Sequence, residues 1–228
     1  MRTANIFFLL MVCFFAKAQA QAQETYTIKP GENILEVVQL KNLFQYPAFI
    51  DGLVFFRDGR VVKSKLNYNY FNAQVQFIDG KGDTLTLAEE NTIKYIIIAR
   101  DSFFYHNGYI QMIQQGGTVM LGKRVYFKEF EQKKGAYGLS SGTSAAISAS
   151  TIIDKRAFDF NTDREMTLVK ATDYMFGNTN EFLLADKKNL IKLFPKYKKT
   201  IAEYLDDTSI NFKQEEDLVK LFAFLKGL

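Results

Sequence analysis

The chain is poor in the residues that most metal and catalytic sites require. Its 228 residues include one cysteine, Cys13, one histidine, His106, and no tryptophan. Zinc and copper sites usually gather three or four nitrogen or sulfur ligands, and one cysteine and one histidine are too few for such a site. We expect no metal, no cofactor and no assigned catalytic residue. His106 itself, within Tyr-His-Asn-Gly, reads as an ordinary exposed residue of a hairpin turn.

Long hydrophobic runs are also missing. The longest run is Ile6 to Phe15, whereas a membrane span needs about 20 residues. Arg2 precedes it, and alternate alanines from position 16 to 22 follow it. This pattern predicts a secretory signal peptide over residues 1–22, so that the protein is secreted or periplasmic and has no transmembrane segment after cleavage.

Cys13 lies inside this leader. Val12 before it is large, and Phe14 and Phe15 after it continue the apolar run, which disfavours a lipid-anchored export signal. The mature chain would then contain no cysteine and no disulfide.

Proline and net charge are low as well. Three prolines argue against a disordered linker. Removal of Arg2 and Lys17 leaves 27 basic against 25 acidic residues, an excess too weak to indicate a nucleic-acid partner. The sequence contains neither a G-x-G-x-x-G nor a P-loop pattern, and the remaining length of about 206 residues suits one domain.

Alternation of apolar and polar residues is the strongest positive signal. In LNYNYFNAQVQFIDGKGDTLTL (66–87), Leu66, Tyr68 and Tyr70 alternate with polar residues, which predicts a half-buried strand. The phase changes at Phe71-Asn72, where we expect a turn. Core packing is the better explanation for the two tyrosines, and recognition is the lesser one.

Turn signals such as Asp58-Gly59 and Asp79–Asp83 separate further short apolar runs. The expected strands are 53–56, 62–70, 73–77, 84–87, 92–98, 102–105, 109–114, 118–121, 125–130 and 167–175. We expect 92–98 to be a central strand buried on both faces. The spacing predicts an antiparallel meander sheet, a sandwich or a partly open barrel within a β-rich domain over 23–185.

The pattern becomes helical after residue 185. Leu190, Ile191 and Phe194 share one face, Pro195 suits the first turn of a second helix, and acids at 215–217 suit the start of a third. The fold class is therefore α+β, mainly β, with a tail of two to three short helices over 186–228 packed on the sheet. A Ser/Gly/Ala-rich loop at 135–151 could hold one more short helix at 144–150.

Several short motifs carry a resemblance. They are Tyr46-Pro47, the Leu-Asn-Tyr-Asn that ends at Asn69, Phe77-Ile78 followed by Gly-Asp-Thr-Leu, and Gly135-Ala-Tyr-Gly138. With the Lys-rich tail, this set resembles a group of uncharacterised exported envelope proteins of Bacteroidota-type bacteria. The resemblance implies an envelope or secreted location and no particular activity.

Two motifs suggest chemistry but are incomplete. Ser140 lies in a G-x-S-x-G match, yet the charged residues 131–134 do not suit the buried strand that precedes a nucleophile elbow, and His106 comes before Ser140 in the chain. The Asp159–Glu165 loop spaces oxygen ligands as a calcium loop does, but Arg164 and Lys170 replace the glycine and the closing glutamate. Whether this loop binds calcium stays open.

A non-enzymatic envelope protein is the function that these observations favour. It would be a binding or structural module for another envelope protein, lipid or glycan, with its ligand-binding residues unassigned. A lysine cluster at 187–199 could dock on anionic lipid or polysaccharide, although a solvated helix face explains it more simply. The alternative function is a hydrolase that uses paired carboxylates or Ser140.

Overall fold

The protein is described by a computed structural model over residues 24–130, 146–148 and 163–228. The strands are β1 (Thr25–Ile28), β2 (Ile50–Phe56), β3 (Val61–Asn69), β4 (Gln74–Ile78), β5 (Thr84–Thr86), β6 (Ile93–Ile98), β7 (Asp101–Tyr105), β8 (Tyr109–Gly116), β9 (Val119–Phe130), β10 (Ala146–Ser148), β11 (Met166–Gly177) and β12 (Phe182–Leu184). The helices are α1 (Ile34–Val38), α2 (Leu40–Leu43), α4 (Lys187–Leu193), α5 (Lys198–Asp207) and α6 (Glu215–Lys226), with 3₁₀ turns at Glu90–Thr92 and Pro195–Tyr197.

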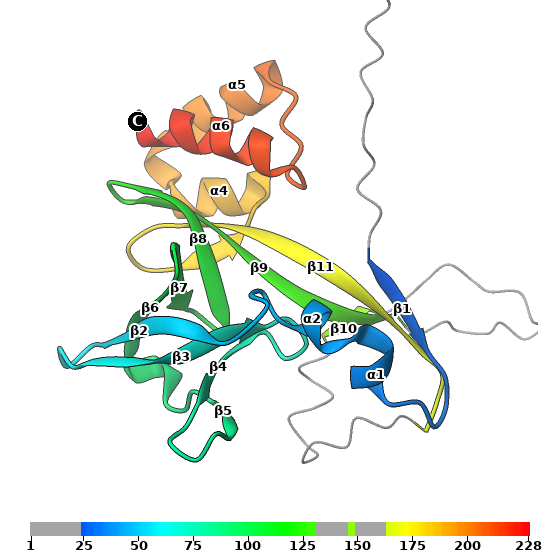
Figure 1. Cartoon of the computed structure of the whole chain (residues 1–228). Coiled ribbons are helices and arrows are strands. Elements are labelled where there is room, and N and C mark those ends of the chain that lie inside the picture. The colour runs from blue at the N-terminus through cyan, green and yellow to red at the C-terminus, as the bar shows by residue number, and fades with distance from the viewer. Residues whose placement is uncertain (1–23, 131–145, 149–162) are drawn as a thin grey trace, which may run out of the picture.

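All twelve strands belong to one antiparallel sheet, ordered β1-β11-β9-β8-β7-β6-β2-β3-β4-β5, with β10 on β9 and β12 on β11. Figure 1 shows the long strands β9 and β11 linking the two ends of the molecule. Helices α4, α5 and α6 lie at one end, and α1, α2 and β1 lie at the other. The predicted fold class, mainly β with a C-terminal helical tail, is confirmed.

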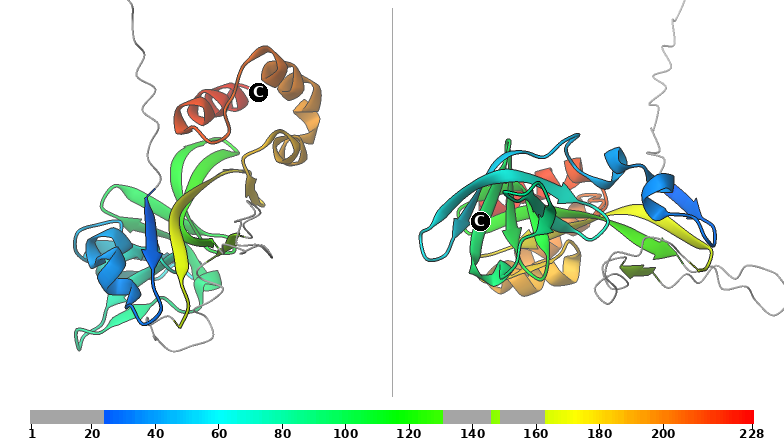
Figure 2. Two further views of the ribbon diagram at one scale, coloured as in Figure 1. Left: turned by 90° about the vertical axis from the view of Figure 1, so that its right-hand side faces the viewer. Right: turned by 60° about the horizontal axis from the view of Figure 1, so that its bottom comes forward.

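The sheet curls until the end of β3 reaches the middle of β9. The amide of Phe127 donates to the carbonyl of Tyr70 at 3.0 Å, and the hydroxyl of Tyr68 donates to the carbonyl of Val125 at 3.0 Å. These bonds join the two strands without a continuous ladder, so the described strands form a partly open barrel. Figure 2 shows its curvature from two further sides.

The two faces of the curled sheet differ in burial. We call inner the face that carries Val54, Ile96, Phe103 and Tyr109, all at most 1% exposed. Tyr68, from the tyrosine-rich segment, is 3% exposed and stacks on Phe103 within this cluster. The assignment of Tyr68 to core packing is therefore confirmed.

Tyr70 packs against two buried clusters while remaining half-buried. We call outer the opposite face, which carries the alternate residues of the same strands.

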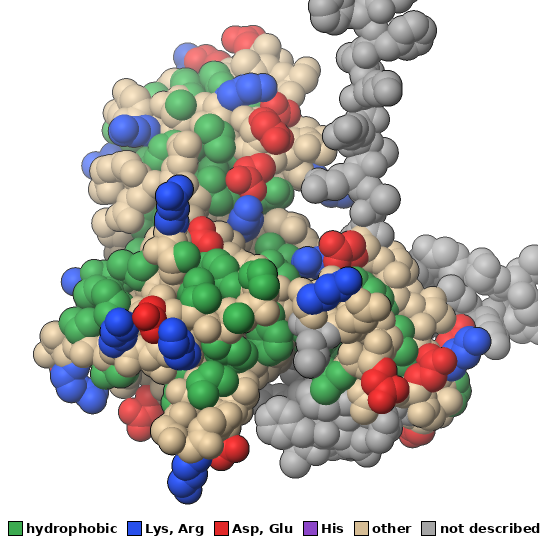
Figure 3. Space-filling view, in the orientation of Figure 1, with side chains coloured by type: hydrophobic (Ala, Val, Ile, Leu, Met, Phe, Trp, Pro, Cys, Tyr) green, Lys and Arg blue, Asp and Glu red, His purple; other side chains and the backbone are tan. Residues whose placement is uncertain are grey.

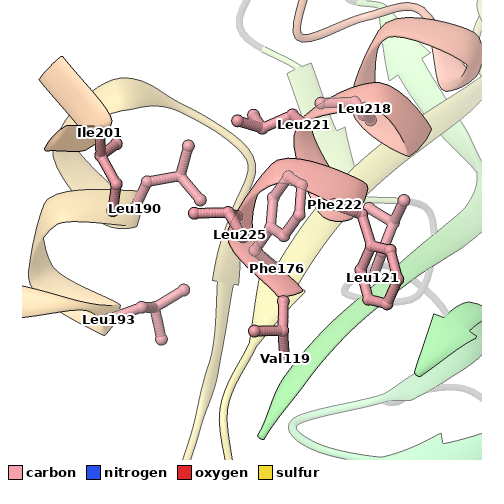
Figure 4. Close-up of a cluster of buried hydrophobic side chains, with 10 residues drawn as sticks. All are labelled: Val119, Leu121, Phe176, Leu190, Leu193, Ile201, Leu218, Leu221, Phe222 and Leu225. Atoms are coloured by element: carbon pink, nitrogen blue, oxygen red, sulfur yellow. The ribbon is translucent and has the colours of Figure 1, made fainter. Parts of the chain in front are cut away.

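The C-terminal helices cover the inner face where β9 and β11 extend past the barrel. Figure 4 shows the buried side chains of this joint. Phe222 and Leu218 of α6 meet Leu121 of β9 and Phe176 of β11, and the last two are fully buried. Lys123 of β9 pairs with Glu215 of α6 at 3.0 Å on the rim. The amphipathic helices thus bury their apolar stripes on the sheet, as short helices must.

A second cover lies at the N-terminal end. Asn33 caps α1 by accepting from the amide of Leu35, and Ile34 and Val38 of α1 pack near Phe127 of β9. Neither α1, α2, β1 nor β12 was predicted, because each is three to five residues long and shows too little periodicity for a pattern.

Three local expectations are wrong. The runs 118–121 and 125–130 form one strand, β9, because Gly122 to Arg124 continue the pairing with β11. Residues Ala146–Ser148 form a strand on β9 in place of the expected short helix. Tyr95 and Ile97 of β6 are only partly buried and Lys94 is exposed, so β6 is fully buried on its inner face alone.

Candidate functional site

The outer face of β2, β6 and β7 carries a row of aromatic rings. Phe55 of β2 pairs with Tyr95 of β6 in the ladder, and their rings stack at 4.4 Å between centroids. Tyr95 in turn lies 5.9 Å from the ring of Phe104 on β7. Leu53 and Ile97, which also pair with each other, continue the apolar surface one step along the strands. We call these five residues, with Val61, the outer aromatic face.

The outer aromatic face lies outside all four buried clusters of the described chain. Its five strand-centre residues are partly buried, and Val61 at its margin is 52% exposed. Figure 3 shows hydrophobic side chains gathered over the region of β2 and its neighbours in this orientation. Contiguous apolar surface is a common feature of interaction sites, so this face is the candidate site.

The same face is covered where it continues onto β8 and β11. There Phe182 of β12 packs on Ile110 and Met175, and Ile110 is fully buried. Gly122 makes this possible, since a Cβ at that position would collide with Ile110. The described residues thus cover one part of the outer face and leave the part over β2, β6 and β7 open.

Charged residues border the outer aromatic face. Asp51 lies between Lys63 and Lys65, at 3.4 and 2.9 Å from their ammonium groups. Arg57 and Arg60 follow at the β2–β3 turn, where the Arg60 guanidinium lies over the ring of Phe56, an inner-face residue, 4.7 Å from its centre. A polar rim around an apolar centre is the usual arrangement of a binding surface.

A polar cluster closes the end of the barrel beside this face. Tyr46 donates from its hydroxyl to Asp101 at 2.5 Å, and the side-chain amide of Gln45 donates to the same carboxylate at 3.0 Å. Burial and then the hydrogen bond to Asp101 raise the pKa of the Tyr46 hydroxyl far above its ordinary value. A neutral tyrosine tied to a carboxylate in this way anchors the loop, and we assign the cluster a structural role.

Asn67 fixes the same loop from the other side. Its side chain donates to the carbonyls of Tyr46 and Ala48 and accepts from the amides of Tyr46 and Tyr68. The residue is 1% exposed, so every polar atom of its amide is used inside the protein. The asparagines of the tyrosine-rich stretch therefore hold the fold at this point.

His106 lies in the β7–β8 turn, as predicted, but it is half-buried and its ring is 6.0 Å from that of Phe182. The carbonyl of His106 accepts from Arg124 at 3.0 Å. Ser140 and Cys13 lie outside the described residues. The hydrolase alternative on Ser140 therefore remains a prediction.

The calcium-like loop is described only at its end. Asp159 lies outside the described residues. Arg164 is in ion-pair distance of Glu129, 2.6 Å, and Glu129 is fully buried. Lys170, at the position where a calcium loop needs its closing glutamate, pairs with Glu24 at 3.6 Å and lies 4.2 Å from the centre of the Tyr70 ring. Both cations thus have structural roles at β9 and β11.

The lysine cluster of the tail is partly neutralised. Lys187, Lys192 and Lys199 pair with Asp206, Glu181 and Glu203. The first pair joins α4 to α5, the second joins α4 to the turn before β12, and the third lies within α5. These ion pairs neutralise part of the cluster's charge, which weakens the hypothesis that it docks on an anionic surface.

Across residues 24–130, 146–148 and 163–228, no group of three His, Cys, Asp or Glu side chains is placed to hold a metal ion. No helix in these ranges has the length and apolar character of a membrane span.

The outer aromatic face was missed because β6 was interpreted as buried on both sides. Its residues Ile93–Ile98 are nearly all apolar, and a continuous apolar strand looks the same in the sequence whether its second face meets a helix or solvent. The predicted antiparallel meander could have indicated an uncovered face, because sheets of this type often leave one face exposed.

Comparisons with known proteins give no relative. No family model matches the chain, and neither the curated proteins nor the solved structures provide a significant match.

Proposed function

We propose that this chain is an exported, non-enzymatic protein of the cell envelope that works as a binding module. Its partner contacts the outer aromatic face. The observation that carries the proposal is the row of Phe55, Tyr95 and Phe104, which is only partly buried on a face that the described chain leaves open.

Aromatic rings on strands suit this role. Each ring offers a large contact area on a backbone that the sheet already holds rigid, so binding orders few additional bonds. Tyrosine also keeps a hydroxyl for a polar contact at the edge of the interface. The resemblance to exported Bacteroidota-type proteins and the leader at 1–22 support the envelope as the setting.

A site-specific cross-linker at Tyr95 tests the contact. The full chain with benzophenone at this position is produced in its native cells and irradiated, and its adducts are identified. Glu203 of α5 is the matched control, because its side chain is 62% exposed and lies on the opposite end of the molecule. We expect adducts at Tyr95 well above those at Glu203; equal yields at the two positions would contradict a partner on this face.

Export is tested in the same cells. Fractionation should place the protein outside the cytoplasm, and mass spectrometry should find a mature N-terminus near Ala22. An intact leader on a cytoplasmic protein would remove the envelope from the proposal. Loss of a hydrolytic activity in Ser140→Ala would instead support the hydrolase.

A further inference from the structure

The β2–β3 hairpin ends in two exposed valines. Val61 and Val62 are 52% and 45% exposed, and as consecutive strand residues they point to opposite faces. Figures 1 and 2 show this hairpin extending beyond its neighbours at the edge of the molecule. The tip therefore presents apolar side chains on both of its sides.

The fold of the hairpin does not depend on these valines. Gly59 adopts a φ of +92° that the turn requires, Asp58 accepts from the amide of Arg60 at 3.0 Å, and the amide of Phe56 donates to the carbonyl of Arg60 at 2.9 Å. Polar contacts thus close the turn. Exposed valine side chains cost free energy in water, so their presence at a projecting tip indicates contact with something apolar.

Cations surround the tip. Arg57, Arg60, Lys63 and Lys65 all belong to the hairpin, whereas its acids are Asp51 and Asp58. Both acids already contact these cations, Asp58 with Arg60 at 2.7 Å. Figure 3 shows blue side chains next to green ones where the hairpin lies. The net positive charge therefore accompanies the exposed apolar surface.

We propose that the hairpin tip docks on an anionic phospholipid bilayer, a proposal that rests on the binding module proposed above and names its partner. Val61 and Val62 enter the interfacial layer, and the four cations lie against lipid phosphates. Phe55, which pairs with Val61, and Tyr95, which stacks on Phe55, then lie at headgroup depth. Apolar insertion with cationic contacts is how proteins hold to anionic bilayers without spanning them.

The β4–β5 hairpin provides an internal control. It exposes Leu85 to 44%, close to the values of the two valines. Its loop, Asp79 to Asp83, contains two acids and one lysine. Apolar exposure is thus matched between the hairpins while the sign of the neighbouring charge is reversed.

The absence of tryptophan makes a clean test possible. Val61→Trp and Leu85→Trp each introduce the sole tryptophan of the chain. Each mature protein is mixed with vesicles of phosphatidylglycerol and phosphatidylcholine, or of phosphatidylcholine alone. We expect a blue shift of the emission for Val61→Trp with the anionic vesicles only, and no shift for Leu85→Trp. Equal shifts for both variants, or none for Val61→Trp, would overturn the lipid proposal.

Cosedimentation measures the affinity without a probe. Binding of the unlabelled protein to anionic vesicles should fall with added salt. The double variant Val61→Asp/Val62→Asp should weaken this binding about tenfold or more, because the variant loses the apolar anchor and its two new carboxylates lower the net charge of the tip by two. Leu85→Asp should bind as the unchanged protein does. Far-UV circular dichroism of each variant establishes that it is folded.

The result separates the two proposals. If Tyr95 cross-links a protein and the anionic vesicles do not bind, the lipid proposal is wrong and the binding module stands. If neither Tyr95 cross-linking nor vesicle binding is seen, both proposals are wrong.

Discussion

The helix-covered end of β9 and β11 and the outer aromatic face are built from similar residues with opposite outcomes. Leu121 and Phe176 at the first are fully buried beneath α6, whereas Phe55 and Tyr95 at the second are only partly buried. Both regions lie on strands of one sheet. The described residues thus cover one apolar surface and leave the other open, so stability should depend on the first and, under the proposal, binding on the second.

The largest expected effect is in the covered region. Phe176→Ala should lower the free energy of unfolding by about 3–5 kcal/mol, because it leaves a cavity between β11 and α6. Phe55→Ala on the outer aromatic face should cost less, about 1–2 kcal/mol, since the ring is partly exposed and its removal leaves no enclosed cavity. Urea unfolding of both variants measures the contrast, and equal losses would refute the division of roles.

A smaller loss is expected at the loop of residues 46–48, which Asn67 anchors. Asn67→Ala leaves the amides and carbonyls of the 46–48 loop without their buried partner. We expect it to cost about 1–3 kcal/mol and to increase hydrogen exchange in the loop. Asn72→Ala is the matched control, because the side chain of Asn72 accepts one bond from the amide of Gln74. An Asn67→Ala protein as stable as Asn72→Ala would show that the loop holds without this residue.

Much of this architecture could be predicted from the sequence. Alternation over 62–70 and the turns at Asp58-Gly59 and Asp79–Asp83 have local causes, and the structure places strands and turns there. The join at Gly122 could not be predicted, because Gly and two cations in succession look like a turn, and only pairing with β11 makes them a strand.

The candidate site depends on long-range contacts and was harder to predict. Phe55, Tyr95 and Phe104 come together only because β6 lies between β2 and β7. Their exposure depends on how far the cover by β12 extends over the outer face, and a local pattern contains no information about that. The export signal, by contrast, is predicted from a contiguous sequence pattern alone, and it stays a prediction.

The stability of the helix-covered end should depend on pH through Tyr174. At the covered end, burial and the nearby Glu215 raise the pKa of Tyr174 to about 12. A tyrosine in the unfolded chain has a pKa of about 10, so the Tyr174 hydroxyl stays protonated to a higher pH in the folded state. Its contribution to the free energy of unfolding is complete below about pH 10 and is lost as the pH rises toward about 12.

Urea midpoints measured across this interval should therefore fall with pH, and less steeply in Tyr174→Phe. A slope that is identical in the two proteins would show that Tyr174 titrates alike in both states.

Asp51→Asn should change the stability of the fold least and should strengthen binding to anionic vesicles. Asp51 lies on the rim of the outer aromatic face between Lys63 and Lys65, and their proximity lowers the pKa of its carboxyl. The carboxylate is exposed, so Asp51→Asn should leave the urea midpoint unchanged. It frees both lysines from a competing anion, and one unit of charge near an anionic bilayer corresponds to about fivefold in affinity.

Tighter binding of Asp51→Asn to phosphatidylglycerol vesicles with unchanged stability would show that the binding surface is separate from the residues that stabilise the fold. Unchanged or weaker binding would mean that Lys63 and Lys65 do not face the lipid.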